Sequence, residues 1–166
     1  VFLRAQGWRF EGDWPDDPKL VILAAPHTAN WDGVLMIAAV GYYRTGLSWM
    51  GKKSLGNGLG GRFLKAIGCI PVDRKKSADV VGQMASAFAK ADRLMLCVPP
   101  EATRAPNANW KSGFYHIAKS AGVPILITVL DGAKRIRLSG ILYPGESYAE
   151  DLKIIASHYK DAKGLH

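Results

Sequence analysis

Three short segments of this 166-residue chain combine residue types suited to moving a chemical group onto a hydroxyl. The first runs from His27 to Asp32, so that an imidazole and a carboxylate stand five positions apart. On one ideal helix such residues point about 140° away from each other, because each step turns about 100°. The two side chains therefore meet only if a helix begins between them. Asn30, a good N-cap residue, would leave His27 in the loop and place Asp32 in the first turn.

A carboxylate that binds one imidazole nitrogen fixes the tautomer and leaves the other nitrogen free to act as a base. General-base catalysis of this kind is worth roughly 10²- to 10⁴-fold. No serine stands in a Gly-x-Ser-x-Gly elbow, so the sequence favours direct attack by a substrate hydroxyl, without an acyl-enzyme. The alternative is that His27 only ends a strand and Asp32 only caps a helix.

The second segment is Asp73-Arg74, which follows a short apolar run at residues 69–72. A guanidinium grips a phosphate through two parallel charge-assisted hydrogen bonds, each worth about 1.5 to 3 kcal/mol. Arg74 is therefore a candidate phosphate ligand. The alternative is a solvated Asp-Arg pair at the surface.

The third segment follows the apolar run at residues 94–98 and includes Glu101, Thr103 and Arg104, with Lys111 further along. Arg104 and Lys111 would supply cationic donors to a phosphate, while Glu101 and Thr103 would orient them or bind an acceptor hydroxyl. The alternative is an ordinary polar loop.

Apolar runs and turn residues predict the elements that carry these segments. Strands are expected at residues 20–25, 47–50, 69–72, 94–98, 123–130 and 135–142, with an edge strand within 2–14. Helices are expected at residues 30–43, 62–67, 77–91, 112–121 and 147–160. This alternation predicts one α/β domain over residues 1–166, with a central, mainly parallel sheet that is mixed at its edge and helices on both faces. Functional residues of such sheets gather beyond the carboxyl ends of the strands.

The chain carries a net charge of +8, which makes nucleic acid, anionic lipid and phosphorylated small molecules the candidate partners. Much of the positive charge lies in one stretch, namely Lys52, Lys53, Arg62, Lys65, Arg74, Lys75 and Lys76. Apolar residues lie beside these cations, at Leu55, Leu59, Phe63 and Ile67. The stretch would either seat the protein on an anionic membrane or form an ordinary amphipathic packing helix.

Other residue types narrow the function further. Cys69 and Cys97 lie far apart in apolar surroundings, which predicts core thiols. His116, His158 and His166 have no partner at metal-ligand spacing, so we expect no metal site. The aromatic residues are too scattered for base stacking, which argues against nucleic acid. No apolar run reaches the ~18 residues of a membrane-spanning helix.

In their order along the chain, the three segments resemble the motif blocks of the glycerol-phosphate and lysophosphatidic acid acyltransferase family. The first is similar to the family's His, four residues, Asp block, the second to its Asp-Arg block, and the third to its Pro-Glu-Gly-Thr-Arg block. Val123-Pro124-Ile125 is similar to a fourth block. The resemblance covers roughly residues 20–130.

The resemblance implies transfer of a fatty acyl group from a thioester of coenzyme A or acyl carrier protein to the hydroxyl of a lysophosphatidic-acid-like acceptor. It implies that His27 is the base and Asp32 orients it, that Arg74, Arg104 and Glu101 bind the acceptor's phosphate, and that Val123 and Pro124, with Asn30, line the acceptor or acyl pocket. No bound cofactor is implied. The implied location is cytoplasmic, peripheral on the inner face of the cell membrane.

Two residues depart from the family pattern and bear on the acceptor more than on the reaction. Ala102 stands where the family usually has glycine, so a positive φ there would cost roughly 1 to 2 kcal/mol. Pro99 replaces a usual aromatic or aliphatic residue and stiffens the loop entry. Three alternatives stay open: another lyso-lipid acceptor such as lyso-ornithine lipid, a thioesterase that uses water, and a non-catalytic basic domain that binds membrane or nucleic acid.

Overall fold

The computed structural model describes residues 7–25, 39, 41–73, 77–100, 110–131 and 134–160. Its strands are β1 (Arg9–Glu11), β2 (Lys19–Ala25), β3 (Ser48–Lys52), β4 (Cys69–Val72), β5 (Leu94–Cys97), β6 (Ile125–Asp131) and β7 (Arg135–Leu142). Its helices are η1 (Lys53–Gly56), α3 (Gly58–Ala66), α4 (Ser77–Lys90), α5 (Gly113–Ala121) and α6 (Tyr148–Ser157). Within this described part of the chain, no helix is both long enough and apolar enough to cross a bilayer.

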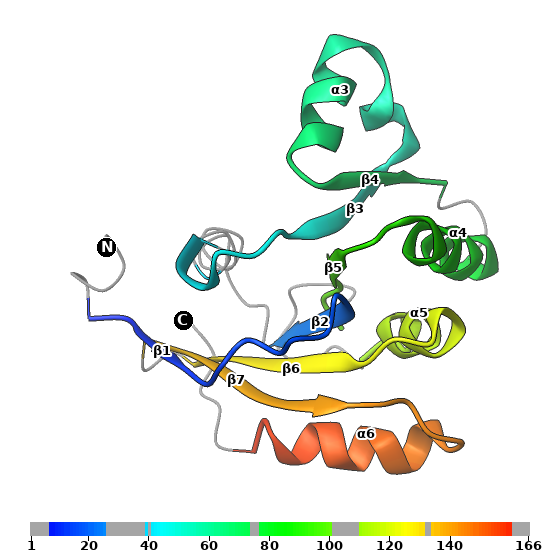
Figure 1. Cartoon of the computed structure of the whole chain (residues 1–166). Coiled ribbons are helices and arrows are strands. Elements are labelled where there is room, and N and C mark those ends of the chain that lie inside the picture. The colour runs from blue at the N-terminus through cyan, green and yellow to red at the C-terminus, as the bar shows by residue number, and fades with distance from the viewer. Residues whose placement is uncertain are drawn as a thin grey trace.

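The strands form a single seven-stranded sheet in the order β1-β7-β6-β2-β5-β3-β4, which twists across the molecule in Figure 1. The strands from β6 to β4 are mutually parallel, whereas β7 is antiparallel to β6 and β1 is parallel to β7. The parallel part follows from the helical crossovers, and the reversal follows from the short connection between β6 and β7. The prediction of a mainly parallel sheet that is mixed at one edge is therefore confirmed.

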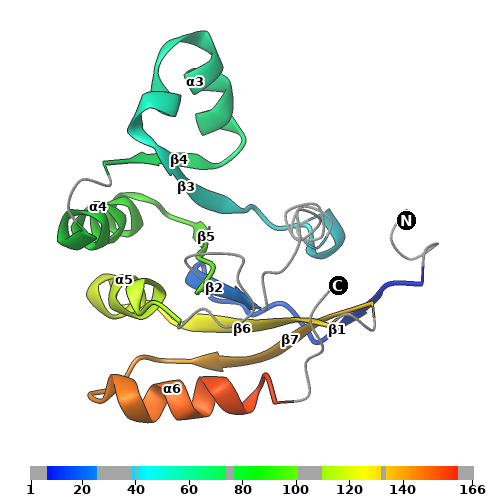
Figure 2. The same cartoon turned by 180° about the vertical axis from the view of Figure 1, so that it is seen from behind.

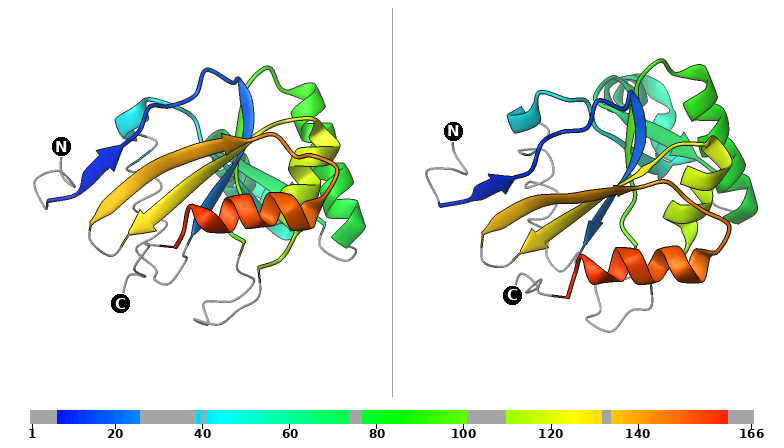
Figure 3. Two further views of the ribbon diagram at one scale, coloured as in Figure 1. Left: turned by 90° about the horizontal axis from the view of Figure 1, so that it is seen from below. Right: turned by 60° about the horizontal axis from the view of Figure 1, so that its bottom comes forward.

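Strand β2 lies near the centre of the sheet and alternates its side chains between two hydrophobic layers. On one face, Val21 and Leu23 belong to a buried cluster that also contains residues of α4, α5 and α6, such as Phe88, Phe114 and Ile155. Figures 1 and 2 show α4 and α5 side by side, and Figure 3 shows α6 running along β6 and β7.

The second face of the sheet has its own buried layer. It includes Leu20, Ile22 and Leu126 from the strands, together with Ala39, which is helical and buried. Helices therefore contact both faces of the sheet, as the sequence predicts. Because the strands are covered on both faces, the continuous apolar runs seen in β2 and β6 are what this sheet requires.

A small helical unit, η1 followed by α3, extends beyond the β3–β4 end of the sheet (Figure 1). Two glycines make it possible. Gly61 is buried against η1, where a Cβ would collide with the backbone of Gly56. Gly68, at φ +107°, turns the chain into β4 at a place where a Cβ would collide with the carbonyl oxygen of Leu47. Helix α3 begins earlier than the sequence pattern predicts, because Gly58, Gly60 and Gly61 belong to the helix rather than to a loop.

Candidate active site

The three motif segments follow strands that end at the same edge of the sheet. Strand β2 pairs in parallel with β5, β5 pairs in parallel with β3, and β3 pairs in parallel with β4. The carboxyl ends of β2, β5 and β4 therefore face the same direction. Neighbouring strands lie about 4.8 Å apart, so the ends of β2 and β5 are adjacent and that of β4 lies roughly 14 Å from β2.

Most of the motif side chains lie outside the described residues. These are His27, Asn30, Asp32, Arg74, Glu101, Thr103 and Arg104. The described structure instead fixes the points on the sheet from which each segment departs. Ala25 ends β2 two positions before His27, Asp73 directly precedes Arg74, and Pro100 directly precedes Glu101. Of the remaining predicted site residues, Lys111 lies at this carboxyl edge, whereas Val123 and Pro124 do not.

The end of β2 is held by a tyrosine from beyond α6. The hydroxyl of Tyr159 lies 3.2 Å from the carbonyl oxygen of Leu23 and 3.1 Å from that of Thr128. These two carbonyls belong to neighbouring strands: Leu23 lies two positions before the end of β2, and Thr128 lies at the middle of β6. Tyr159 thus anchors the chain that follows α6 beside the strand end that leads to His27.

The end of β4 is held by a side-chain amide from α4. Gln83 accepts a hydrogen bond from the backbone N–H of Asp73 at 3.0 Å and donates one to the carbonyl oxygen of Asp73 at 3.2 Å. The amide thus replaces the partner that a further strand would give to this edge position. The Asp73 carboxylate also lies 3.8 Å from the ammonium of Lys53. Both contacts act on the residue immediately before Arg74.

The two ends of the segment between Pro100 and Lys111 lie together at the sheet. The N–H of Val98 donates to the carbonyl oxygen of Ile22 at 2.9 Å, which continues the pairing of β5 with β2. The N–H of Lys111 donates to the carbonyl oxygen of Pro100 at 2.8 Å. This bond joins the two ends of the segment that contains Glu101, Thr103 and Arg104, so the segment begins and ends at the carboxyl edge.

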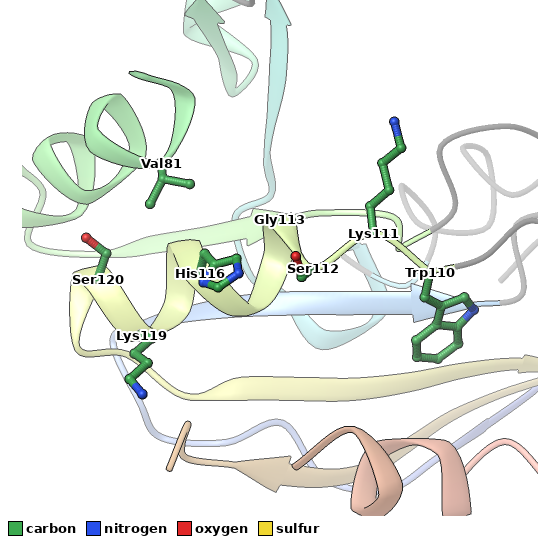
Figure 4. Close-up of a pocket in the computed structure, with 8 residues that line it drawn as sticks. All are labelled: Val81, Trp110, Lys111, Ser112, Gly113, His116, Lys119 and Ser120. Atoms are coloured by element: carbon green, nitrogen blue, oxygen red, sulfur yellow. The ribbon is translucent and has the colours of Figure 1, made fainter. Parts of the chain in front are cut away.

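Helix α5 begins beside this junction, and its positive dipole end faces the same edge. Its N-cap residue, Ser112, makes no side-chain capping bond, so the first N–H groups of α5 are not capped by that hydroxyl. An open hollow of about 840 Å³ lies along α5 and includes Lys111, Ser112, His116 and Val81 of α4 among its lining residues. Figure 4 shows Lys111 and Trp110 extending to opposite sides of the chain.

Trp110 separates this hollow from a smaller one. Its ring lies 5.1 Å from that of Tyr159 in an edge-to-face arrangement. Trp110 and Tyr159, together with Leu152 and Ala156 of α6, line a second hollow of about 290 Å³ with mainly apolar walls. The carboxyl edge thus offers a cationic approach at Lys111 and an apolar one behind Trp110.

Cys97 ends β5 at this edge, and a cysteine could serve as a covalent nucleophile there. Its environment argues against that role, because burial raises the pKa of the thiol to about 12. A thiol of this kind stays protonated at neutral pH and is a poor nucleophile. Cys69 is buried and Cys97 is half-buried, and both cysteines are free thiols, as the sequence predicts. Among the described residues, no group of three His, Cys, Asp or Glu is arranged to hold a metal ion.

Val123 and Pro124 lie at the opposite edge of the sheet from the motif segments. They directly precede β6, and the carbonyl oxygen of Pro124 accepts a hydrogen bond from Val21, near the start of β2. Ala25 lies four positions after Val21, which is about 13 Å along the strand at 3.3 Å per residue. Val123 is buried in the core against α5. This position gives both residues a packing role and does not bring them to the carboxyl edge.

Three residues at the carboxyl edge escaped the reasoning from sequence: Gln83, Trp110 and Tyr159. Gln83 stands in an otherwise regular helical pattern, and nothing in its sequence context distinguishes it from a solvated residue. Trp110 adjoins the third motif, and this closeness in sequence is the signal that could have identified it as a site residue. Tyr159 lies 132 positions after His27, so only the fold relates it to the site.

One known protein family matches the part of the chain that carries the three motifs. The family model described as Acyltransferase matches residues 14–130, which is more than half of the chain. No curated protein and no solved structure matches the chain significantly. The matched range contains all three motif segments and the strands that carry them. The chain therefore belongs to the acyltransferase family, that of the glycerol-phosphate and lysophosphatidic acid acyltransferases.

Proposed function

We propose that this acyltransferase moves a fatty acyl group from an acyl-CoA or acyl carrier protein thioester to the hydroxyl of a lysophosphatidic-acid-like acceptor. His27 is the general base and Asp32 orients it. The observation that carries the proposal is the shared carboxyl edge: β2, β5 and β4 are parallel, and each precedes one of the three motifs.

In the proposed reaction, His27 accepts the proton of the acceptor hydroxyl as its oxygen attacks the thioester carbonyl. The tetrahedral intermediate then collapses, the carbon–sulfur bond breaks, and the leaving thiolate takes the proton back from the imidazolium. The Asp32 carboxylate stabilises that imidazolium and holds the reactive tautomer. No acyl-enzyme is formed, and the protonated Cys97 at the end of β5 supports this route because it is unsuited to attack.

Arg74 and Arg104 hold the acceptor's phosphate in this proposal, with Glu101, Thr103 and Lys111 orienting them or binding the acceptor. Two described features support it. Gln83 and Lys53 both contact Asp73, which fixes the chain immediately before Arg74. The bond between Lys111 and Pro100 returns Lys111 to the start of the segment that contains Arg104.

The partners of the proposed enzyme are a lysophospholipid acceptor, an acyl-CoA or acyl carrier protein donor, and an anionic membrane surface, with no role for nucleic acid. We propose that it works in the cytoplasm, peripherally on the inner face of the cell membrane, in phospholipid synthesis. No resident cofactor takes part. The net charge of +8 supports the choice of an anionic surface.

The decisive experiment measures transfer of a labelled acyl group from its thioester by the His27→Ala and Asp32→Asn variants. Loss of the base predicts a fall in turnover of about 10²- to 10⁴-fold. Lys90→Ala is the control, because Lys90 is exposed at the end of α4, outside the three motifs and outside the lining of both hollows. Turnover by His27→Ala at the wild-type rate would exclude the mechanism.

The acceptor is tested with a panel of lyso-lipids that carry or lack a phosphate. Transfer to phosphate-bearing acceptors is expected, with KM raised by Arg74→Gln and Arg104→Gln. Transfer only to phosphate-free acceptors, lyso-ornithine lipid among them, would replace the acceptor assignment. Free fatty acid released equally fast with and without acceptor would instead indicate a thioesterase.

A further inference from the structure

The unit formed by η1 and α3 has an exposed apolar stripe. Of the eight large apolar side chains that are exposed in the described part of the chain, four lie in this unit or at its end: Leu55, Leu59, Phe63 and Ile67. Leu59 is 85% exposed and Phe63 is 65% exposed. Leu59, Phe63 and Ile67 are spaced four residues apart, so they lie along one face of the helix.

The packing of the unit fixes which way this stripe faces. Gly61 is the buried residue of α3, and it contacts η1 so closely that any side chain there would strike the backbone of Gly56. Positions 59 and 63 lie on the other side of the helix from Gly61, because each step turns the helix by about 100°. Figures 1 and 2 show α3 projecting from the end of the sheet beyond β4.

The surroundings of the stripe are cationic. Lys52, Lys53, Arg62 and Lys65 are all exposed, and no acidic residue occurs between Lys52 and Val72 in the sequence. Lys53 contacts Asp73, the residue before Arg74. The stripe and its cations are therefore continuous with the carboxyl edge of the sheet at β3 and β4.

We propose that the outward face of α3, made of Leu59, Phe63 and Ile67 with Arg62 beside them, is the surface on which the protein docks to an anionic lipid bilayer. An apolar stripe flanked by cations suits the boundary between acyl chains and anionic headgroups. A second copy of this chain fits less well, since a symmetric contact would set the same cations against each other. The biological role of this surface rests on the proposed function, because docking here holds the carboxyl edge beside the membrane that contains the acceptor.

The test measures sedimentation of the protein with lipid vesicles that contain no acceptor. Binding is expected to vesicles containing phosphatidylglycerol, and to be weak with phosphatidylcholine alone or at high salt. Arg62→Glu should weaken binding by at least about fivefold, the share of one lost cation. Leu59→Asp and Phe63→Asp should each weaken it by about tenfold or more.

Matched controls lie on α6 and α4. Ile154 is 51% exposed on α6, and Lys153 and Lys90 are exposed cations away from the stripe. Ile154→Asp, and Lys153→Glu combined with Lys90→Glu, should leave vesicle binding nearly unchanged. A second measurement does not depend on disruptive variants: a polarity-sensitive dye on Leu59→Cys should shift to the blue with vesicles, whereas the same dye on Ile154→Cys should not.

The outcomes separate docking from catalysis. The α3 variants should keep wild-type turnover with a short-chain acceptor that is soluble in water, while His27→Ala should lose turnover and still bind vesicles. Wild-type protein that ignores anionic vesicles, or control variants that lose binding equally, would overturn the proposal. Self-association that Phe63→Asp abolishes, without vesicle binding, would assign the stripe to a second copy instead.

Discussion

The contact between Gln83 and Asp73 gives a prediction whose size follows from the structure. The Gln83 amide makes two hydrogen bonds to the backbone of Asp73, at 3.0 and 3.2 Å. Each contributes about 1 kcal/mol net, so both together favour the observed placement of Asp73 by about 2 kcal/mol. That free energy corresponds to roughly a 30-fold change in an equilibrium constant. Gln83→Leu removes both bonds while keeping a side chain of similar size on α4.

Because Arg74 follows Asp73 directly, the loss should appear in acceptor binding. A site that is correctly placed only part of the time binds more weakly in proportion to that fraction. We therefore expect Gln83→Leu to raise KM for a phosphate-bearing acceptor by up to about 30-fold, with little change in kcat at saturation. Gln83→Glu keeps the acceptor for the Asp73 N–H but loses the donor, so a smaller rise of about fivefold is expected.

The assay is steady-state acyl transfer with the acceptor concentration varied, repeated with a phosphate-free acceptor whose KM should not respond. Tyr43→Phe serves as the control, because it removes a single hydrogen bond to a backbone carbonyl, that of Gly12, before β2 begins. A fall in kcat with unchanged KM, or an equal rise in KM for Tyr43→Phe, would refute the positioning role of Gln83.

Three further predictions concern stability and thiol reactivity. Gly68→Ala should lower the free energy of unfolding by about 2 kcal/mol or more in urea titrations. The reason is that a residue with a Cβ is strained at φ +107° and that this Cβ would meet the carbonyl oxygen of Leu47. Unchanged stability would refute this packing. Burial, and then the hydrogen bond to Asp151, raise the pKa of Tyr115 to about 12, so its contribution to stability should be full below about pH 10 and be lost as the pH rises toward 12. Tyr115→Phe should flatten this alkaline loss, and an identical pH profile would contradict it. Cys97 should react with a thiol reagent at mildly alkaline pH far more slowly in the folded protein than in denaturant, and equal rates would contradict its half-buried, protonated state.

Much of the fold could be predicted from local patterns. The buried run at Leu20–Ala25 predicted a strand covered on both faces, and β2 occupies that position near the centre of the sheet. Ser147 predicted the start of the last helix, and its hydroxyl accepts a hydrogen bond from the N–H of Glu150. These features depend on residues close together in the sequence, so composition and spacing are enough to reveal them.

The candidate site also combines features that the local sequence predicts with features that depend on the fold. The types and spacing of His27, Asp32 and Arg74 are local, and they were sufficient to identify the family that the comparison shows. The motif residues were not sufficient to place Val123 and Pro124, because a motif match says nothing about which end of a strand a residue occupies. Strand direction and pairing place them at the amino edge, about 13 Å or more along the sheet from the end of β2.

The sequence by itself determined the alternation of strands and helices, the buried runs and the three motifs, because hydrophobic periodicity and local chemistry act over a few residues. Only the tertiary structure decided the strand order, and with it the common edge for three motifs that are far apart in the chain. It also decided which long-range contacts hold that edge, such as Gln83 on Asp73 and Tyr159 on the carbonyls of Leu23 and Thr128. The physical reason is that such contacts depend on which elements pack together, and many orders of the same elements would satisfy the local pattern equally well.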